Sequence, residues 1–224
     1  MNESEYDEGE YTVITADVIS SREIEDFTGR ARERLIAINE EVECEYSFSL
    51  LRGDEIQGVL AGGLPTELPA TVRLLRYFLY PFEVRIGVGA GLIAREEMTD
   101  NPWELTGEAF HRAREALNYL NKNDRQRTYV KSDQKKIDII VNSLWLLMDV
   151  IQARWTEAQW EAIHVYEKEG TYRKASQKLD IALQNVEKRC SAASWKEFRQ
   201  AEENMGQILD WFHRGTMTAS GKDN

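Results

Sequence analysis

The chain has 224 residues, a formal charge of −11 and only two cysteines, Cys44 and Cys190. Two distant cysteines exclude a disulfide framework and a zinc-finger site. The acidic start has no leader-like apolar core, and no apolar run reaches the roughly 20 residues that a membrane span needs. We therefore expect a cytoplasmic protein without membrane insertion, and the length favours two domains.

The acidic excess belongs to the first part of the chain. From Ala153 onward there are 11 basic and 11 acidic residues, which leaves 17 basic and 28 acidic residues before it. A negative charge of this size weakens non-specific attraction to a polyanion. Any contact with nucleic acid is therefore expected from a local patch in the second part.

Residues 1–131 show alternating strand and helix patterns. The β-branched run "YTVITADVI" is typical of a buried strand, and the glycine-bearing "FEVRIGVGAGLIA" is typical of a central one. Strands are predicted at 11–19, 46–51, 55–62, 82–94 and 125–130, and helices at 22–41, 66–80 and 107–121. This order predicts an α+β fold, in which helices pack on a ferredoxin-like sheet of the split β-α-β style.

The second part is predicted to be all-α. A long amphipathic helix over 132–154 would connect the first domain to a helix-turn-helix domain of residues 155–224. Thr156 and Gln159 form a capping-box pattern, and the helix that they begin would end at Gly170. Asp180 would occupy the tight turn after a second short helix. The last helix, 195–213, has an apolar stripe to be covered by the connector or by a second copy, and we expect the "TASGKDN" that ends the tail 210–224 to be disordered.

Two aspartates form the first candidate site. Asp17 ends the first strand and Asp54 follows Gly53 at a hairpin tip, and in a split β-α-β sheet these elements are neighbours. Two carboxylates this close repel by about 1 kcal/mol in water unless a cation lies between them. Mg²⁺ is bound by one or two carboxylates together with phosphate oxygens. Alternatively, Asp54 is only a turn residue and the serines after Asp17 only cap a helix.

The segment "VISSR" after Asp17 would complete a site for a metal-bound nucleotide. Backbone N–H groups just before a helix form an anion site, and Arg22 can make a bidentate phosphate contact. The candidate nucleotide-binding residues are Val18, Ile19, Ser20, Ser21, Arg22 and Arg52.

Four segments resemble, in order and spacing, the motifs of class III nucleotidyl cyclases: "ITADVISSR", "LLRGDEIQG", "VRIGVGAGLI" and "TGEAFHRAREAL". GGDEF diguanylate cyclases share their palm fold. The chain resembles still more closely the SatD family of prokaryotic proteins. These resemblances imply a palm domain with Asp17 and Asp54 as the metal ligands, a phosphate-binding backbone at Val18–Ser21, and a purine nucleotide as ligand.

The last of these segments departs from the cyclase pattern. His111 and Glu115 stand where cyclases carry an asparagine and the arginine that stabilises the transition state. An interaction of that type is commonly worth roughly 2.7 to 4 kcal/mol. The resemblance therefore implies nucleotide binding more strongly than cyclisation.

The segment after Trp155 resembles the helix-turn-helix of sigma-factor region four. Its recognition helix would carry Leu183, Gln184, Asn185, Lys188 and Arg189, and Arg173, Lys174 and Lys178 would bind phosphates. Gln, Asn and Arg are the side chains that make bidentate base contacts in a major groove. Ala182 replaces the usual capping Ser or Thr. The alternative is a bundle of three helices used for oligomerisation.

Three functions follow from these patterns. The first is a DNA-binding regulator with a sensor domain that binds a nucleotide and Mg²⁺ but does not catalyse cyclisation, working as a monomer or a homodimer. The second is an active Mg²⁺-dependent nucleotidyltransferase or cyclase that makes a nucleotide second messenger. The third is an adaptor in which neither site is functional.

Overall fold

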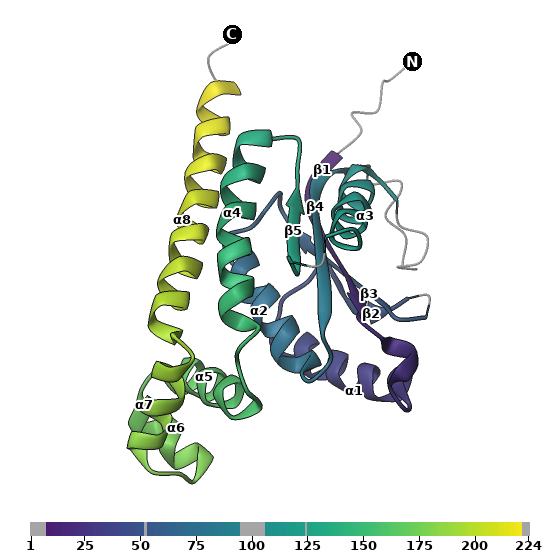
Figure 1. Ribbon diagram of the computed structural model, residues 1–224. Coiled ribbons are helices and arrows are strands. Elements are labelled where there is room, and N and C mark those ends of the chain that lie inside the picture. Colours follow the sequence, from purple (N-terminus) through teal and green to yellow (C-terminus); the bar gives the residue numbers. More distant parts are fainter. Residues whose placement is uncertain (1–7, 52, 95–105, 124, 221–224) are drawn as a thin grey trace, which may run out of the picture.

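A five-stranded mixed sheet forms the centre of the molecule (Figure 1). The computed structural model describes residues 8–51, 53–94, 106–123 and 125–220. The strands lie in the order β2-β3-β1-β4-β5, and every neighbouring pair is antiparallel except β4 and β5, which are parallel. Their bounds are β1 Glu8–Val18, β2 Tyr46–Leu50, β3 Glu55–Ala61, β4 Val84–Ala94 and β5 Thr128–Lys131.

Helices cover both faces of the sheet. On one face lie α1 (Phe27–Asn39) and α2 (Leu68–Leu79) together with α4 (Lys135–Gln152), and α3 (Glu108–Leu120) covers the opposite face. The longest helix, α8 (Trp195–Ser220), lies along the outer side of α4 and α2. The apolar stripe of α8 therefore packs on the connector helix α4, which was one of the two predicted alternatives.

Three glycines of β4 let α3 approach the sheet closely. A Cβ atom at Gly89 would lie 2.1 Å from the Ala109 carbonyl oxygen and from the Ala113 backbone nitrogen. At Gly87 the same atom would lie 2.6 Å from the backbone of α3. The strand is central, as its glycines predicted, and the absence of side chains at these glycines makes room for the backbone of α3.

One hydrophobic core extends from the sheet into the C-terminal helices. Trp155, in the loop after α4, packs against Trp160 and Phe198, with ring centroids 4.5 and 4.8 Å away. Its indole Nε1 donates to the Ala193 carbonyl oxygen at 2.7 Å. This aromatic cluster joins the end of α4 to the helices that follow it.

The α+β class with a mixed sheet is confirmed, and two helix boundaries differ from the prediction. The first helix begins at Phe27 rather than Arg22, because Asp26 caps it by accepting from the Gly29 backbone N–H. The last helix continues to Ser220 rather than ending at His213, so residues 218–220, expected to be disordered, are helical. The last four residues lie outside the described part.

Within the described residues, no helix is both long and apolar enough to cross a lipid bilayer.

Candidate functional site

The end of β1 places Asp17 between two charged neighbours. The register pairs Asp17 with Glu55 of β3 and with Arg85 of β4. Arg85 Nη1 lies 3.3 Å from Asp17 Oδ2, and Arg114 of α3 donates to Glu55 Oε2 at 2.7 Å. Neighbours across a strand pair share one face of a sheet, so these carboxylates and arginines form one polar edge beside α3.

Asp54 is held at the same edge by Ser21. The Ser21 hydroxyl donates to Asp54 Oδ2, and Gly53 has the positive φ of 72° that the hairpin tip requires. The structure therefore brings together Asp17, Ser21 and Asp54, which lie up to 37 positions apart in sequence. We refer to these three residues, with Glu55 and Arg85, as the sheet-edge site.

The pKa of Asp17 is raised by this environment. Burial is the largest cause and repulsion by Asp54 is the second, while attraction to Arg85 opposes both. A carboxylate that is repelled by another carboxylate gains from a cation between them. The sheet-edge site therefore has the electrostatics of a cation site that Arg85 neutralises in part.

The carboxylates of Asp17 and Asp54 suit a magnesium ion that takes its remaining ligands from water or phosphate. Among the described residues, no group of three or more His, Cys, Asp or Glu side chains is arranged to hold a metal ion. Mg²⁺ commonly takes one or two carboxylates and fills its remaining positions with water and phosphate oxygens. A metal at Asp17 and Asp54 would thus depend on a phosphate-bearing ligand for full coordination.

Fewer backbone N–H groups after Asp17 are available to a phosphate than the sequence suggests. The Ile19 N–H donates to the Glu83 carbonyl oxygen at 2.8 Å, and Val18 is buried at the end of β1. Only a three-residue 3-10 helix, Ser21–Glu23, follows, and Ser20 before it has a φ of 55°. A phosphate would therefore meet Ser20, Ser21 and the exposed Arg22 rather than the whole segment. Arg52 lies outside the described residues.

Two charged side chains of α3 pair with residues of the sheet. Glu115 pairs with Lys131 of β5, whereas Arg114 pairs with Glu55 beside Asp17. Consecutive residues of a helix lie about 100° apart around its axis, so the two side chains leave α3 in different directions.

Helices α5 (Glu157–Glu169), α6 (Tyr172–Leu179) and α7 (Leu183–Ala192) form a compact trihelix. The Thr156 backbone N–H donates to Gln159 Oε1 at 2.9 Å, as the capping-box pattern predicts. Gly170 and Asp180 both have left-handed backbone conformations, with φ of 73° and 52°. Ala175 and Val186 are fully buried where the three helices meet.

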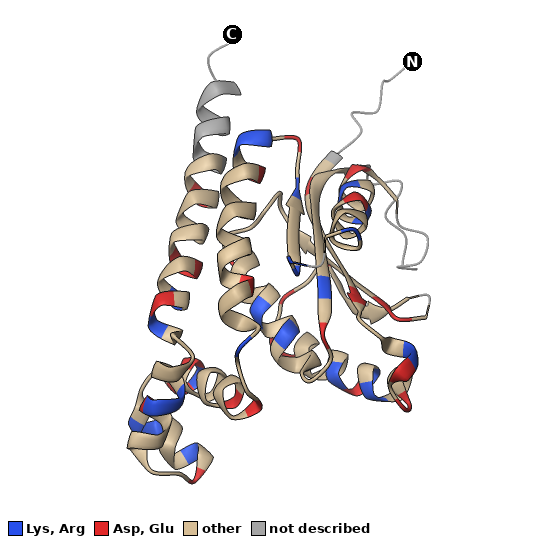
Figure 2. Ribbon diagram, viewed as in Figure 1, with Lys and Arg blue, Asp and Glu red and all other residues tan. Residues whose placement is uncertain are grey.

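The predicted DNA-contacting side chains lie mostly on the outside of this trihelix. Those that are exposed are Arg173, Lys174, Lys178, Gln184, Asn185 and Lys188. Leu183 is half-buried, and Arg189 lies with its Nη1 3.4 Å from Glu161 Oε2. Residues 171–192 contain five Lys or Arg and two Asp or Glu, a net charge of +3. In Figure 2 the Lys and Arg positions along α6 and α7 are blue.

The sequence did not reveal the charged residues that surround the predicted site. Arg85, Glu55 and Arg114 were not among its predicted members, although each pairs with or adjoins Asp17. For Glu55 and Arg85 the available signal was a charge in a mostly apolar strand, whereas Arg114 lies among other charged residues of its helix. Register and the position of α3 were needed to find them.

Comparison with known proteins gives a family and a distant structural similarity. A crystal structure of a regulator of polyketide synthase expression from Bifidobacterium adolescentis aligns at 8% sequence identity and a TM-score of 0.31. The alignment covers 91% of this chain and 82% of that one. No curated protein matches the chain. The model of the SatD family matches residues 11–208, and the chain therefore belongs to the SatD family.

Proposed function

We propose that this protein is a DNA-binding regulator in which α5–α7 contact the duplex and the sheet-edge site binds a metal-associated purine nucleotide. The observation that carries the proposal is the outer surface of α6 and α7. Gln184, Asn185 and Lys188 are exposed on α7, and Arg173, Lys174 and Lys178 are exposed on α6, the helix that packs against α7. Amide side chains on a recognition helix contact base edges, and neighbouring lysines neutralise phosphates.

The charge distribution supports this assignment. The chain carries −11 overall, yet residues 171–192 carry +3. Phosphate neutralisation supplies much of the affinity for DNA, so a local basic surface is required on a chain that otherwise repels a polyanion. A trihelix used only for oligomerisation has no need for this separation of charge.

The sheet topology supports a palm-like sensor. The order β2-β3-β1-β4, with α1 and α2 as connections on one face, is that of the split β-α-β arrangement. Asp17 and Asp54 then lie at one edge, as two metal-binding aspartates require. Glu115 stands where cyclases carry an arginine. It has the opposite charge and pairs with Lys131. We therefore propose nucleotide binding without cyclisation.

Fluorescence anisotropy with DNA from the region upstream of the gene tests the first half of the proposal. We expect Gln184→Ala to weaken binding to the preferred sequence by about 1 to 3 kcal/mol. Lys188→Ala should weaken binding to all sequences and reduce the salt dependence by about one phosphate contact.

Lys196→Ala is the matched control for the lysine, because Lys196 is also exposed but lies at the start of α8. Equal losses in the two lysine variants would show that binding follows total charge rather than α7. Absence of binding by the wild type to any fragment, including selected random sequences at low salt, would refute the DNA-binding role.

A further inference from the structure

A pocket of about 430 Å³ lies where the sheet meets the C-terminal helices. Its walls come from α2, the segments before β4 and before β5, the end of α4 and the beginning of α5. A volume of this size is in the range of small-molecule sites. We call it the junction pocket. It shares no residue with the sheet-edge site.

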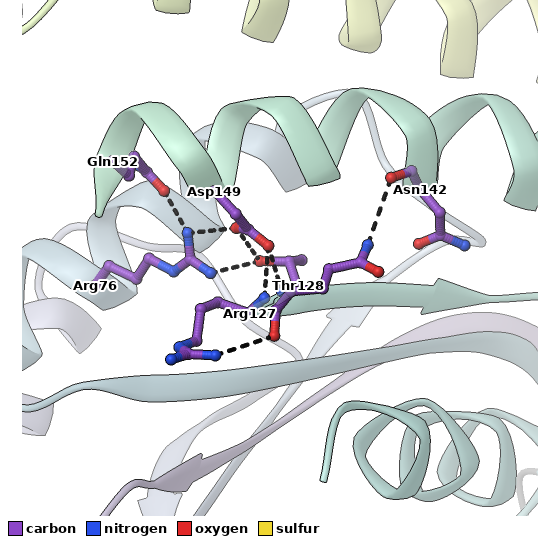
Figure 3. Close-up of polar contacts among 7 residues, drawn as sticks. Arg76, Arg127, Thr128, Asn142, Asp149 and Gln152 are labelled. Atoms are coloured by element: carbon purple, nitrogen blue, oxygen red, sulfur yellow. Dashed lines mark hydrogen bonds and ion pairs between the residues drawn. The ribbon is translucent and has the colours of Figure 1, made fainter. Parts of the chain in front are cut away.

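Buried polar groups are fixed beneath this pocket. Arg76 of α2 donates to Thr128 Oγ1 at 2.7 Å and to the Gln152 side-chain oxygen, and it pairs with Asp149 Oδ1 at 2.8 Å (Figure 3). Asp149 also accepts from the backbone N–H groups of Arg127 and Thr128, at 2.7 and 2.8 Å. This network fixes the wall of the pocket in one arrangement.

One donor of the network has no acceptor. Gln152 is only 4% exposed, and its Nε2 is buried without a hydrogen-bond partner within the described residues. Buried side-chain donors are nearly always satisfied, and Gln152 is one of the residues that line the pocket, so its free amide N–H is available to an acceptor bound there. The Gln152 oxygen already accepts from Arg76, so the assignment of the amide nitrogen to the free position follows from the network.

The mouth of the pocket is cationic. The charged lining residues are Arg76, Arg125, Arg127, Arg154, Glu83 and Asp149, a net charge of +2 on a chain of −11. Arg76 is paired with Asp149, and Arg127 lies 3.8 Å from Glu83. The excess charge therefore belongs to the exposed arginines Arg125 and Arg154, which favours an anionic ligand.

The remaining wall is aromatic. Phe82, Trp155 and Trp160 line the pocket, and Tyr80 and Pro81 extend this apolar side. Aromatic walls with a few fixed polar groups are typical of sites for ligands that carry a flat ring.

We propose that the junction pocket binds a small organic anion carrying a flat ring. Its charged group would lie against Arg125 and Arg154, its ring would lie against the aromatic wall, and one acceptor would take the Gln152 amide. Ligand binding here does not require that α5–α7 bind DNA or that the sheet-edge site bind a metal. A bound molecule would contact both the sheet-bearing part and the start of α5, and would hold them in one arrangement.

Titration of the full chain with AMP, GMP and phenyl phosphate tests this proposal, with inorganic phosphate and adenosine as probes for each half of the ligand. We expect at least one aromatic phosphate to raise the melting temperature saturably and to change tryptophan fluorescence, since two tryptophans line the pocket. It should bind at least 10-fold more tightly than phosphate or adenosine. Failure of all three aromatic phosphates, or equal binding of inorganic phosphate, would overturn the proposal.

Variants locate the bound molecule. Gln152→Glu keeps the acceptor for Arg76 but replaces the orphan donor by an oxygen, so we expect at least 10-fold weaker binding. Arg154→Gln, at an exposed position that does not endanger folding, should weaken binding 3-fold or more, whereas Arg32→Gln on the exposed side of α1 should not. Asp17→Asn should leave the affinity unchanged. Loss of binding in Asp17→Asn, with binding retained in Gln152→Glu and Arg154→Gln, would place the ligand at the sheet edge and refute the junction site.

Discussion

Arg73 of α2 and Glu202 of α8 form a buried ion pair across 129 positions of sequence. Arg73 Nε donates to both carboxylate oxygens, at 2.9 and 3.1 Å, and the two side chains are 7% and 9% exposed. The Arg73 guanidinium also lies 5.0 Å from the centre of the Trp195 ring. The pair fixes the last helix against the layer that covers the sheet.

Breaking this pair should destabilise the protein strongly. Removal of one partner leaves a buried charge without compensation, so we expect Arg73→Met to lower the free energy of unfolding by about 3 to 5 kcal/mol. The double variant Arg73→Met, Glu202→Met should recover most of the loss. Arg199→Met, which removes a half-exposed arginine paired with Glu203, should cost less than about 1 kcal/mol. Urea unfolding measures all three, and equal costs at Arg73 and Arg199 would contradict the expectation.

His164 should make stability depend on pH. Burial against Tyr77, whose ring lies 4.0 Å away, lowers the pKa of His164 to about 4, although Glu41 opposes the shift. The unfolded chain takes up the proton near pH 6.5 and the folded chain only near pH 4. Stability should therefore fall as the pH falls through this window, by at most about 1.4 kcal/mol per pH unit for one proton.

His164→Phe isolates this effect, because a phenyl ring can keep the stacking on Tyr77 but binds no proton. We expect the difference in unfolding free energy between the variant and the wild type to shift in favour of the variant between pH 6.5 and 4. A constant difference across this range would show that His164 does not titrate as its burial implies.

The close approach of α3 makes Gly89 intolerant of a side chain. A Cβ there would meet backbone atoms 2.1 Å away, and backbone cannot rotate aside. We expect Gly89→Ala to cost about 3 kcal/mol or more. Gly58→Ala is the matched control, since its Cβ would meet only the ring of Phe48, at 2.6 Å. A cost at Gly58 equal to that at Gly89 in thermal unfolding would refute the close helix approach.

The sheet-edge site predicts a stabilising effect of divalent cations. With a purine nucleoside triphosphate present, Mg²⁺ or Mn²⁺ should raise the melting temperature of the wild type, because the cation relieves the repulsion that raises the pKa of Asp17. Asp17→Asn and Asp54→Asn should each remove this increment.

Incubation with labelled nucleoside triphosphates separates binding from catalysis at the same site. We expect no cyclic or linear product. Product formed by the wild type but not by Asp54→Asn would establish an active nucleotidyltransferase instead.

An exposed apolar stripe on α4 predicts self-association. Ile139, Leu147 and Val150 are 68%, 65% and 48% exposed, and Leu146 adds to the same helix surface at 42%. Apolar surface of this extent is usually covered in solution. We expect sedimentation to show a dimer at micromolar concentration, which Leu147→Lys weakens at least 10-fold. Ile36→Lys, at an equally exposed aliphatic residue of α1, should leave it intact. A monomer at all concentrations would refute the dimer.

The periodicity of the sequence was sufficient for the elements and their order. β-Branched runs predicted the strands, apolar residues at three- and four-residue steps predicted α1, α2 and α4, and Gly53 located the hairpin tip. The boundary at Phe27 was missed because Ser20, Ser21 and Asp26 are all residue types that favour the N-cap position, and only the fold decides that Asp26 caps this helix.

Some features of the candidate sites could likewise be predicted from the sequence, and others could not. Exposed positions of a helix repeat with its period, so the amide and lysine residues of α7 were predictable from spacing. Pairings such as Arg73 with Glu202 and Arg114 with Glu55 were not, because long side chains from distant segments meet only after the helices have packed.

The sequence by itself determined the α+β class, the position of Asp17 and Asp54 at the ends of their elements, and the trihelix pattern, because each depends on local periodicity, turns and caps. Only the tertiary structure decided that Arg85 and Glu55 flank Asp17, that Ile19 donates to Glu83, and that a cationic pocket lies beside Gln152. Register and helix packing bring these groups together from separate segments, and burial then sets their pKa values and hydrogen bonds.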